Sequence, residues 1–327
     1  MLPFQNGVLV FAKRFFIFFF AVTALSVTAS AVKAAQASII VDAKTGYVLQ
    51  GHEARQKRQI GSLTKIVTAS VILDWAEHKG GDLNQMVTIP PEAFTGVSEN
   101  TVGFQPGDRI SLRDLLYAAL VQSDNAAANT LAYAVGSQLG ALAPAAGGSK
   151  VTPVDVFVGQ MNALAKQLKM ERSRFVNPTG LDDRVRPMPY STAEDMARVT
   201  RYAMNKASFR FYVSQKERQI SFERGPRKMN YVLRNTNELL GRQGIDGVKT
   251  GSTAKAGDCL ILAAERQPEV IQQGAMVQIY PRRLIVVILG SSNRFSEGEQ
   301  LVAGGWQSYD QWAASGRLAA PDQLLQF

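Results

Sequence analysis

Ser62 and Lys65 are the residues best suited by type and spacing to covalent chemistry, and they stand at the start of an apolar stretch. Residues three apart on a helix share one face, so the lysine amine would lie beside the serine hydroxyl. Burial in an apolar helix lowers a lysine pKa and makes the neutral amine available as a base. The pair would be a nucleophile activated without histidine. The alternative is a helix-capping serine with a surface lysine.

A second polar pair, Ser123 and Asn125, lies between two helix-like stretches. A turn at this point can direct both side chains into a cleft. Ser123 could relay a proton to a leaving group, and Asn125 could hold a substrate amide. Capping of the following helix by Ser123 or Asp124 is the alternative interpretation.

A third pattern, Lys249-Thr250-Gly251, stands at the entrance to a set of C-terminal strands. The lysine can bind a carboxylate and Thr250 adds a hydroxyl group. Gly251 lets a substrate backbone approach closely, as glycine on a strand often does. The N–H of Ser252 could then join the N–H of Ser62 in an oxyanion hole.

All three patterns have copies, so the surrounding sequence must select among them. The serine–lysine spacing recurs at Ser252 and Lys255, in a glycine-flanked stretch without a helix pattern. Lys44-Thr45-Gly46 fits a hairpin turn in which Gly46 supplies a positive φ. The remaining copies, at Ser98/Asn100 and Ser291/Asn293, have loop surroundings.

The elements that must position these residues can be read from hydrophobic periodicity. Residues 62–78 predict a helix that is apolar on most faces, which belongs in a core. Further helices are expected over 112–120, 125–135, 154–168, 191–203 and 301–312, the fourth with a Ser191/Glu194 capping box. Strands are expected as a hairpin within 38–50 and over 260–264, 274–279 and 284–289.

Strands therefore lie at both ends of the chain and helices lie in the middle. A two-stranded hairpin is not stable alone, so one sheet built from both ends is the simplest arrangement. We predict an α/β (α+β) fold in which a helical lobe of about 66–235 is inserted into a domain of 35–315. Residues 316–327 are expected to be a short tail, without a spanning run or a basic amphipathic segment.

Composition excludes several classes of site. One cysteine and two histidines leave no multi-cysteine or three-histidine metal centre, and we expect neither metal nor cofactor. Cys259 sits in an apolar run and is expected to be an inert buried thiol. The formal net charge is +9, but no nucleotide-binding motif is present and no nucleic-acid partner is expected.

The N-terminus reads as an export signal. Lys13 and Arg14 precede residues 15–32, which contain no charge and are rich in phenylalanine. A basic flank, an apolar stretch and small residues are typical of a secretory signal, here residues 1–34. An uncleaved anchor is the alternative, because eighteen residues are close to the length that spans a bilayer. Either way we expect an exported protein of the periplasm or cell envelope, with peripheral membrane association open.

Taken as a set and in this order, the three patterns resemble those of the low-molecular-mass penicillin-binding proteins, the D-alanyl-D-alanine carboxypeptidase family of serine peptidases. Flanking stretches that carry the same resemblance are 40–46, 175–181, 235–240, 246–251 and 256–260. It implies a penicillin-binding protein/β-lactamase-like fold, an antiparallel sheet flanked by helices with the site beside the helical lobe.

The resemblance also implies roles. Ser62 would attack the D-Ala-D-Ala amide of a peptidoglycan peptide and Lys65 would take its proton, with β-lactams as covalent inhibitors. The other implied roles are proton transfer to the leaving D-alanine by Ser123 and Lys249, orientation of the peptide by Asn125 and Thr250, and binding of the terminal carboxylate by Arg294.

Three other functions stay open. The same residues could cleave peptidoglycan cross-links as an endopeptidase. A β-lactamase needs a positioned glutamate for deacylation, and no Glu-x-x-Leu-Asn pattern follows Ser123. A non-catalytic envelope scaffold would keep the fold alone. The long hairpin between Arg266 and Arg283 could reshape the edge of the site, bind a partner, or be a tolerated surface loop.

Overall fold

The computed structural model describes Met1 and residues 35–97, 100–140, 151–183, 185–273 and 276–326. Contacts divide the chain into Met1–Val32 and Lys33–Phe327, and the second unit is described here. The expected signal segment, apart from Met1, lies outside the described residues.

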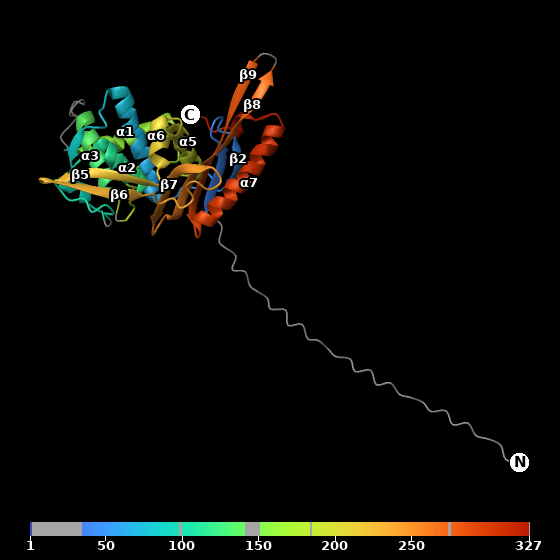
Figure 1. The fold of residues 1–327 in the computed structure, drawn as a ribbon, viewed down its shortest axis with the longest axis horizontal. Coiled ribbons are helices and arrows are strands. Elements are labelled where there is room, and N and C mark those ends of the chain that lie inside the picture. Colours follow the sequence, from blue (N-terminus) through green and yellow to red (C-terminus); the bar gives the residue numbers. More distant parts are fainter. Residues whose placement is uncertain (2–34, 98–99, 141–150, 184, 274–275, 327) are drawn as a thin grey trace. The chain divides into compact units, whose positions relative to one another are not determined.

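A five-stranded antiparallel sheet joins the two ends of this unit, in the order β2-β1-β9-β8-β7 (Figure 1). Its strands are β1 (Ala37–Asp42), β2 (Val48–His52), β7 (Ile245–Thr253), β8 (Gly257–Gln273) and β9 (Met276–Ser291). β1 runs along β9 from the pair Ala37 and Leu289 to the pair Asp42 and Leu284. The strands from both ends therefore form one sheet, as the sequence predicts.

The centre of this sheet is buried on both faces. Residues 284–289 of β9 are each 0% exposed and alternate between two separate apolar clusters. One cluster lies under helix α7 (Arg294–Ala314), where a Cβ on Gly305 would come within 2.9 Å of Ile40. The other cluster continues into the lobe. A strand covered on both sides reads as a continuous apolar run rather than an alternating one.

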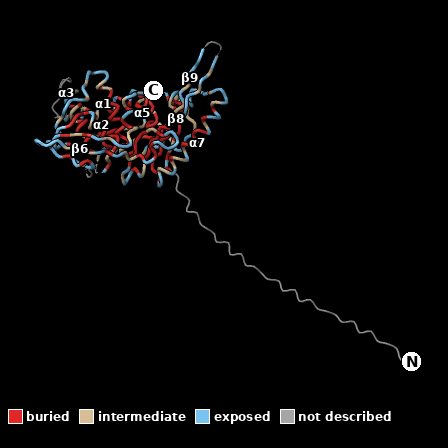
Figure 2. The backbone as a smooth tube through the Cα atoms, in the orientation of Figure 1, coloured by how far each residue is buried: buried red, intermediate tan, exposed pale blue. Residues whose placement is uncertain are grey.

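The lobe is built around helix α1 (Lys65–Lys79), which ends at Gly80 with φ 70°. Ten of its fifteen residues are buried, which explains why its sequence is apolar on most faces. Figure 2 shows the buried positions concentrated in the lobe and across the sheet. The helices around α1 are α2 (Leu112–Val121), α3 (Asn125–Gly140), α4 (Pro153–Gln167), α5 (Ala193–Met204) and α6 (Ala207–Val213).

The lobe also contains a four-stranded antiparallel sheet that the sequence did not reveal, in the order β3-β4-β5-β6. Its strands are β3 (Met86–Thr88), β4 (Arg109–Ser111), β5 (Glu217–Arg224) and β6 (Arg227–Arg234). β3 and β4 are short, and β5 and β6 carry many charged residues, so none of them gives an apolar run. The predicted helical lobe therefore also contains a small sheet.

Two local predictions also need correction. From Met276 on, the expected strands 274–279 and 284–289 belong to one strand, β9, which continues through Pro281, and residues 274–275 lie outside the described residues. The cap of α5 is Thr192, whose side chain accepts from the N–H of Asp195, and not Ser191 with Glu194. Both errors arose from taking local residue preferences as boundaries.

The segment after α7 folds back on the hairpin turn between β1 and β2. Leu325 is buried, its N–H donates to Gly46 O at 2.9 Å, and its carbonyl accepts from the guanidinium of Arg201. A short 3-10 turn, Pro321–Gln323, precedes this contact. Among the described residues, no helix has the length and hydrophobicity needed to cross a membrane.

Cys259 lies on β8 opposite Gly251 and is 0% exposed. Burial raises the pKa of its thiol to about 11.

We expect this thiol to be unreactive in the folded protein. At pH 8 a thiol of that pKa is only about one part in a thousand thiolate, the form that reacts with aromatic disulfides. Treatment with such a reagent should modify almost no native protein and one thiol per chain after denaturation. Rapid stoichiometric reaction of the native chain would contradict the buried placement.

Candidate active site

Ser62 lies in a 3-10 turn, Gly61–Thr64, that leads directly into α1. The Nζ of Lys65 donates to the Oγ of Ser62 at 2.9 Å. The same amine donates to Asn125 Oδ1 at 2.7 Å and to the carbonyl of Thr179 at 3.2 Å, and Lys65 is 0% exposed. The lysine is therefore held in one position, within proton-transfer distance of a serine hydroxyl.

The turn between α2 and α3 brings in the second motif. Asp124 is fully buried and its carboxylate accepts from the N–H of Ala127 at 2.8 Å, which caps α3. The other carboxylate oxygen accepts from Thr101 and from the N–H of Val102. Asp124 thus does the capping, and Ser123, with φ +66°, lines the cleft. A serine in the left-handed region is strained, which is common at functional sites.

Strand β7 contributes a second buried amine. Lys249 is 1% exposed, and its Nζ donates to the carbonyl of Thr250 at 3.1 Å. Burial lowers the pKa of Lys249 well below its usual range, and the charges of Lys65 and Arg294 lower it further. The side-chain hydroxyls of Thr250 and Thr236 are 2.5 Å apart. This strand therefore presents a weakly held proton and a positioned hydroxyl.

Glycines let β7 approach the 3-10 turn Gly61–Thr64 closely. We call this turn, which carries Ser62, the nucleophile turn. A Cβ on Gly251 would lie 2.8 Å from Ile60 O and 3.1 Å from Ser62 N. A Cβ on Gly61 would lie 3.2 Å from Ser252 N. The two segments that carry the N–H groups of Ser62 and Ser252 are therefore adjacent. An oxyanion hole needs two such donors facing one point.

The guanidinium group of Arg294 contributes a positive charge to the lining of the cleft. Nη1 of Arg294, the first residue of α7, donates to Gly251 O at 3.1 Å and to Asp258 Oδ1 at 3.4 Å. The hydroxyl of Ser252 donates to the same Asp258 oxygen at 3.0 Å. The Nε of Arg294 is buried without a hydrogen-bond partner in the structure. Asp258 therefore holds both neighbours in place and partly neutralises the arginine.

The structure places seven of the nine predicted site residues around one cleft of about 500 Å³. They are Ser62, Ser123, Asn125, Thr250, Gly251, Ser252 and Arg294. The other two, Lys65 and Lys249, are buried beside it. The cleft thus lies between the helical lobe and the edge strand of the main sheet.

Sequence analysis missed four residues that shape this cleft. The carbonyl of Thr179 binds Lys65, and Thr236 binds Thr250. Asp182 is buried and accepts from Thr253 at 2.7 Å, and Asp258 binds Arg294. Each lies far along the chain from its partner or acts through a backbone atom, so no spacing pattern indicates it.

Two of the rival copies make other contacts, and Ser98, which begins a third, lies outside the described residues. Asp42 accepts from both the N–H and the hydroxyl of Thr45 in the turn that contains Gly46. Lys255 donates to the backbone carbonyl of Asp182 at 2.9 Å, and not to Ser252. Neither copy therefore places a lysine amine on a serine hydroxyl, although Lys255 and Ser252 both line the cleft.

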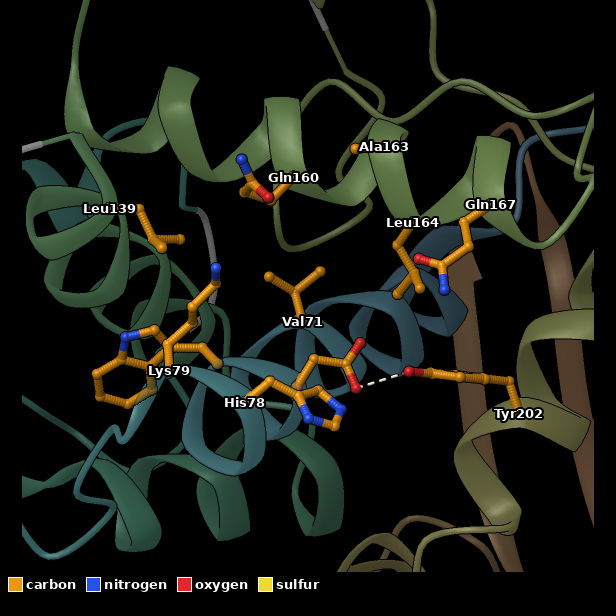
Figure 3. Close-up of a pocket in the computed structure, with 11 residues that line it drawn as sticks. Val71, His78, Lys79, Leu139, Gln160, Ala163, Leu164, Gln167 and Tyr202 are labelled. Atoms are coloured by element: carbon orange, nitrogen blue, oxygen red, sulfur yellow. Dashed lines mark hydrogen bonds between the residues drawn. The ribbon is translucent and has the colours of Figure 1, made fainter. Parts of the chain in front are cut away.

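One side-chain group in the described part of the chain could supply three metal ligands: Asp74, Glu77 and His78. It lies at the opposite end of α1 from Ser62, beside the pocket in Figure 3. Lys206 already binds both carboxylates, at 2.9 Å and 2.5 Å, and the hydroxyl of Tyr202 donates to Asp74. With its acids already paired to an ammonium group, we assign this cluster no metal.

A family model described as D-alanyl-D-alanine carboxypeptidase (peptidase family S11) matches residues 23–276. The chain belongs to this family. D-alanyl-D-alanine carboxypeptidase DacC of Escherichia coli (strain K12) is 33% identical over 308 residues, covering 90% of this chain and 68% of the relative. The D-alanyl-D-alanine endopeptidase of Pseudomonas aeruginosa is 32% identical over 236 residues, covering 70% and 66%. The chain thus spans about two thirds of the length of these curated relatives.

Solved structures agree. The crystal structure of the Streptomyces K15 DD-transpeptidase matches with a TM-score of 0.69 and 27% identity, covering 84% of this chain and 97% of that one. Penicillin-binding protein D2 from Listeria monocytogenes, in its ampicillin-bound form, matches with a TM-score of 0.61 and 25% identity, covering 83% and 97%. The fold of a penicillin-binding serine peptidase, which the sequence predicted, is confirmed.

We predict that Gly180→Ala disrupts the nucleophile turn. Gly180 has φ +85°, and a Cβ there would lie 1.9 Å from the carbonyl of Gly61. We expect the free energy of unfolding to fall by at least about 3 kcal/mol. Gly96, with φ +71° and open space around it, is the matched control. Gly96→Ala should cost only about 1 kcal/mol, from backbone strain. Equal losses in denaturant titrations would show that the contact is unimportant.

We predict that Asp258→Asn increases the affinity of the site for substrates whose carboxylate binds Arg294. The amide can still accept from Ser252 but no longer competes as an anion. We expect KM for a peptide with a free terminal carboxylate to fall about threefold with kcat nearly unchanged, a modest effect because the side chain is 40% exposed. Asp310→Asn, which removes a distant exposed carboxylate, is the control. A rise in KM would mean that positioning by Asp258 outweighs its charge.

Proposed function

We propose that this protein is a serine-type D-alanyl-D-alanine carboxypeptidase that removes the terminal D-alanine of peptidoglycan stem peptides through an acyl-enzyme on Ser62. The contact that carries the proposal is the 2.9 Å hydrogen bond between Lys65 and Ser62 at the cleft. Family membership and the cleft around this pair support the same reaction.

Acylation follows from the positions of the donors. With its amine neutral, Lys65 accepts the proton of the Ser62 hydroxyl, and Oγ attacks the carbonyl carbon of the penultimate D-alanine. The resulting oxyanion accepts hydrogen bonds from the backbone N–H groups of Ser62 and Ser252. The side-chain amide of Asn125, which also binds Lys65, orients the peptide.

Release of D-alanine needs a proton on the amide nitrogen. Lys249 holds its proton weakly, because burial and two neighbouring cations lower its pKa. Ser123, which lines the cleft, relays a proton from the lysines to the nitrogen as the C–N bond breaks. Water then attacks the ester, and the hydroxyl of Ser62 is regenerated.

Arg294 and Lys249 suit a substrate that ends in a carboxylate. The guanidinium of Arg294 lines the cleft next to Gly251, where the end of an extended peptide beside β7 would lie. A charge-assisted hydrogen bond from arginine to a carboxylate is among the stronger polar contacts in proteins. Thr250, held by Thr236, adds a hydroxyl donor at the same place.

β-Lactams would enter as covalent inhibitors. Ser62 would open the lactam ring as it attacks a peptide bond, and the leaving nitrogen stays tethered to the product. No glutamate lines the cleft within the described residues. A class A β-lactamase needs such a residue for fast deacylation. We therefore expect a long-lived penicilloyl enzyme and not an antibiotic-degrading one.

The N-terminal sequence supports export to the periplasm or cell envelope, where the substrate lies. Lys13 and Arg14 precede an uncharged stretch over 15–32, and small residues follow it. We propose that residues 1–34 form a signal peptide that is cleaved. Retention as an N-terminal anchor is the alternative, and N-terminal sequencing of the protein from cells decides between them.

We predict that Ser62→Ala abolishes covalent labelling by fluorescent penicillin. Intact mass should show one adduct on the unmodified chain, mapped to the peptide that contains Ser62, and none on the variant. Ser252→Ala is the matched control, because Ser252 lines the same cleft and begins the rival serine–lysine pair. It should keep its adduct. Labelling of Ser62→Ala would mean that another residue is the nucleophile.

The second candidate is an endopeptidase that cleaves peptidoglycan cross-links. Asp258 favours it, since a carboxylate 3.4 Å from Arg294 weakens the preference for a free terminus. Two relatives at 32% identity are named endopeptidases.

We expect purified uncross-linked pentapeptide muropeptides to lose D-alanine at least about tenfold faster than cross-linked dimers are split, because Arg294 and Lys249 favour the free carboxylate. Chromatography of both digests measures this ratio. Faster splitting of dimers would assign the chain to the endopeptidases.

A further inference from the structure

Strands β8 and β9 continue as a two-stranded ribbon beyond the rest of the main sheet. The pairing of β1 ends at Leu284, and that of β7 ends at Ala264. The pairing of β8 with β9 continues to Gln273 and Met276. Figure 1 shows this hairpin projecting from the body next to the C-terminal end of α7.

The outer part of the ribbon is uncharged and apolar. Residues 270–281 contain no charged side chain, in a chain that is 19% charged. Val270, Met276, Val277 and Ile279 are between 61% and 72% exposed. A projecting segment with this composition is costly in water, so it indicates an interaction surface.

The apolar side chains project from both faces of the ribbon. Val270 pairs directly with Ile279. Val277 lies two residues before Ile279 on β9 and therefore on the same face. Met276 and Ile271 lie on the opposite face, because neighbouring residues of a strand alternate. A protein groove would cover one face. An apolar medium surrounds both, and this distinction favours a lipid surface over a protein partner.

A belt of aromatic and basic side chains surrounds the base of the ribbon. Two cations lie against the ring of Tyr280. The ammonium of Lys44 is 4.0 Å from the ring centre, and the guanidinium of Arg317 is 4.4 Å from it. Arg282 and Arg266 both bind Asp310, at 2.7 Å and 3.2 Å. Glu269 binds Arg282 and Arg317, so the two acids offset part of the positive charge of the belt. Tyrosine and arginine are the residues that lie at the headgroup level of membranes, apolar stem inward and polar end in water.

We propose that the outer part of the β8–β9 hairpin, described over residues 270–273 and 276–280 and called its tip, inserts into the interfacial layer of a bilayer that contains anionic lipids. Four residue pairs span about 13 Å, enough for the 5–10 Å depth typical of interfacial segments. The outer edges of both strands carry unpaired backbone groups, which limits insertion to this layer. The basic side chains around Tyr280 favour anionic headgroups.

Insertion by the hairpin would leave the cleft accessible. Asp258, at the cleft, and Gln273, at the tip, are the two ends of the β8 pairing with β9. Fifteen residues of extended strand separate them, or about 50 Å. A bilayer at the tip is therefore remote from Ser62, and the interaction does not depend on the proposed reaction.

The test places an environment-sensitive fluorophore on the tip of the full-length chain. Val277→Cys is labelled with a nitrobenzoxadiazole dye in a Cys259→Ala background, and Val232→Cys, on exposed strand β6, is the matched control. On addition of vesicles of phosphatidylcholine and phosphatidylglycerol in equal parts, emission at position 277 should shift to the blue and rise about threefold. Emission at position 232 should stay constant, and so should activity on a soluble D-Ala-D-Ala peptide.

Substituting Val270→Asp and Ile279→Asp in the labelled chain should reduce the vesicle-induced rise at least about tenfold, since both apolar contacts are lost. The site-specific signal separates the tip from any binding by the N-terminal segment. No change at position 277, or equal changes at 277 and 232, would overturn the proposal. A shift that grows with protein concentration without vesicles would assign the tip to self-association and overturn it too.

Discussion

The catalytic arrangement depends on one buried amine. Lys65 has no exposed surface, and its Nζ is held by the hydroxyl of Ser62, the amide oxygen of Asn125 and the carbonyl of Thr179. These partners come from three separate segments, so the site exists only when the nucleophile turn, the α2–α3 turn and the loop around Thr179 are packed together. Since a buried amine needs partners, removing any of them costs stability as well as activity.

Close backbone contacts fix the distances that this amine requires. Gly180 lies against the carbonyl of Gly61, and Gly251 lies against Ser62 N, at separations that leave no room for a side chain. Strand β7 is held in turn by β8 and β9, whose centre is buried on both faces. The rigid sheet thereby sets where the Ser252 N–H lies relative to the nucleophile. Protein interiors transmit such constraints because they are close-packed.

The sequence predicts the parts of this protein that local pattern controls. An apolar run marks α1 and β9, and the Ser62–Lys65 spacing indicates a shared helix face before any tertiary contact is known. Local pattern fails where a partner lies elsewhere in the chain. Asp258 and Arg294 are 36 residues apart and meet through the sheet. Strands β5 and β6 are charged on their exposed faces, so their sequences contain no apolar run that would predict a strand. Ser191 and Thr192 are both good caps, but Ser191 forms a β-bridge with Arg58, and Thr192 caps the helix.

Three basic side chains lie close enough at the cleft to repel one another. Lys65, Lys249 and Arg294 lie in or beside it, and the pKa of Lys249 is lowered by burial and by the other two. Asp258 is the carboxylate that contacts Arg294, and it is partly exposed. The site therefore combines a buried amine that contacts the hydroxyl of Ser62 with a second amine that holds its proton weakly. A substrate carboxylate beside Arg294 would therefore offset part of the repulsion among these cations.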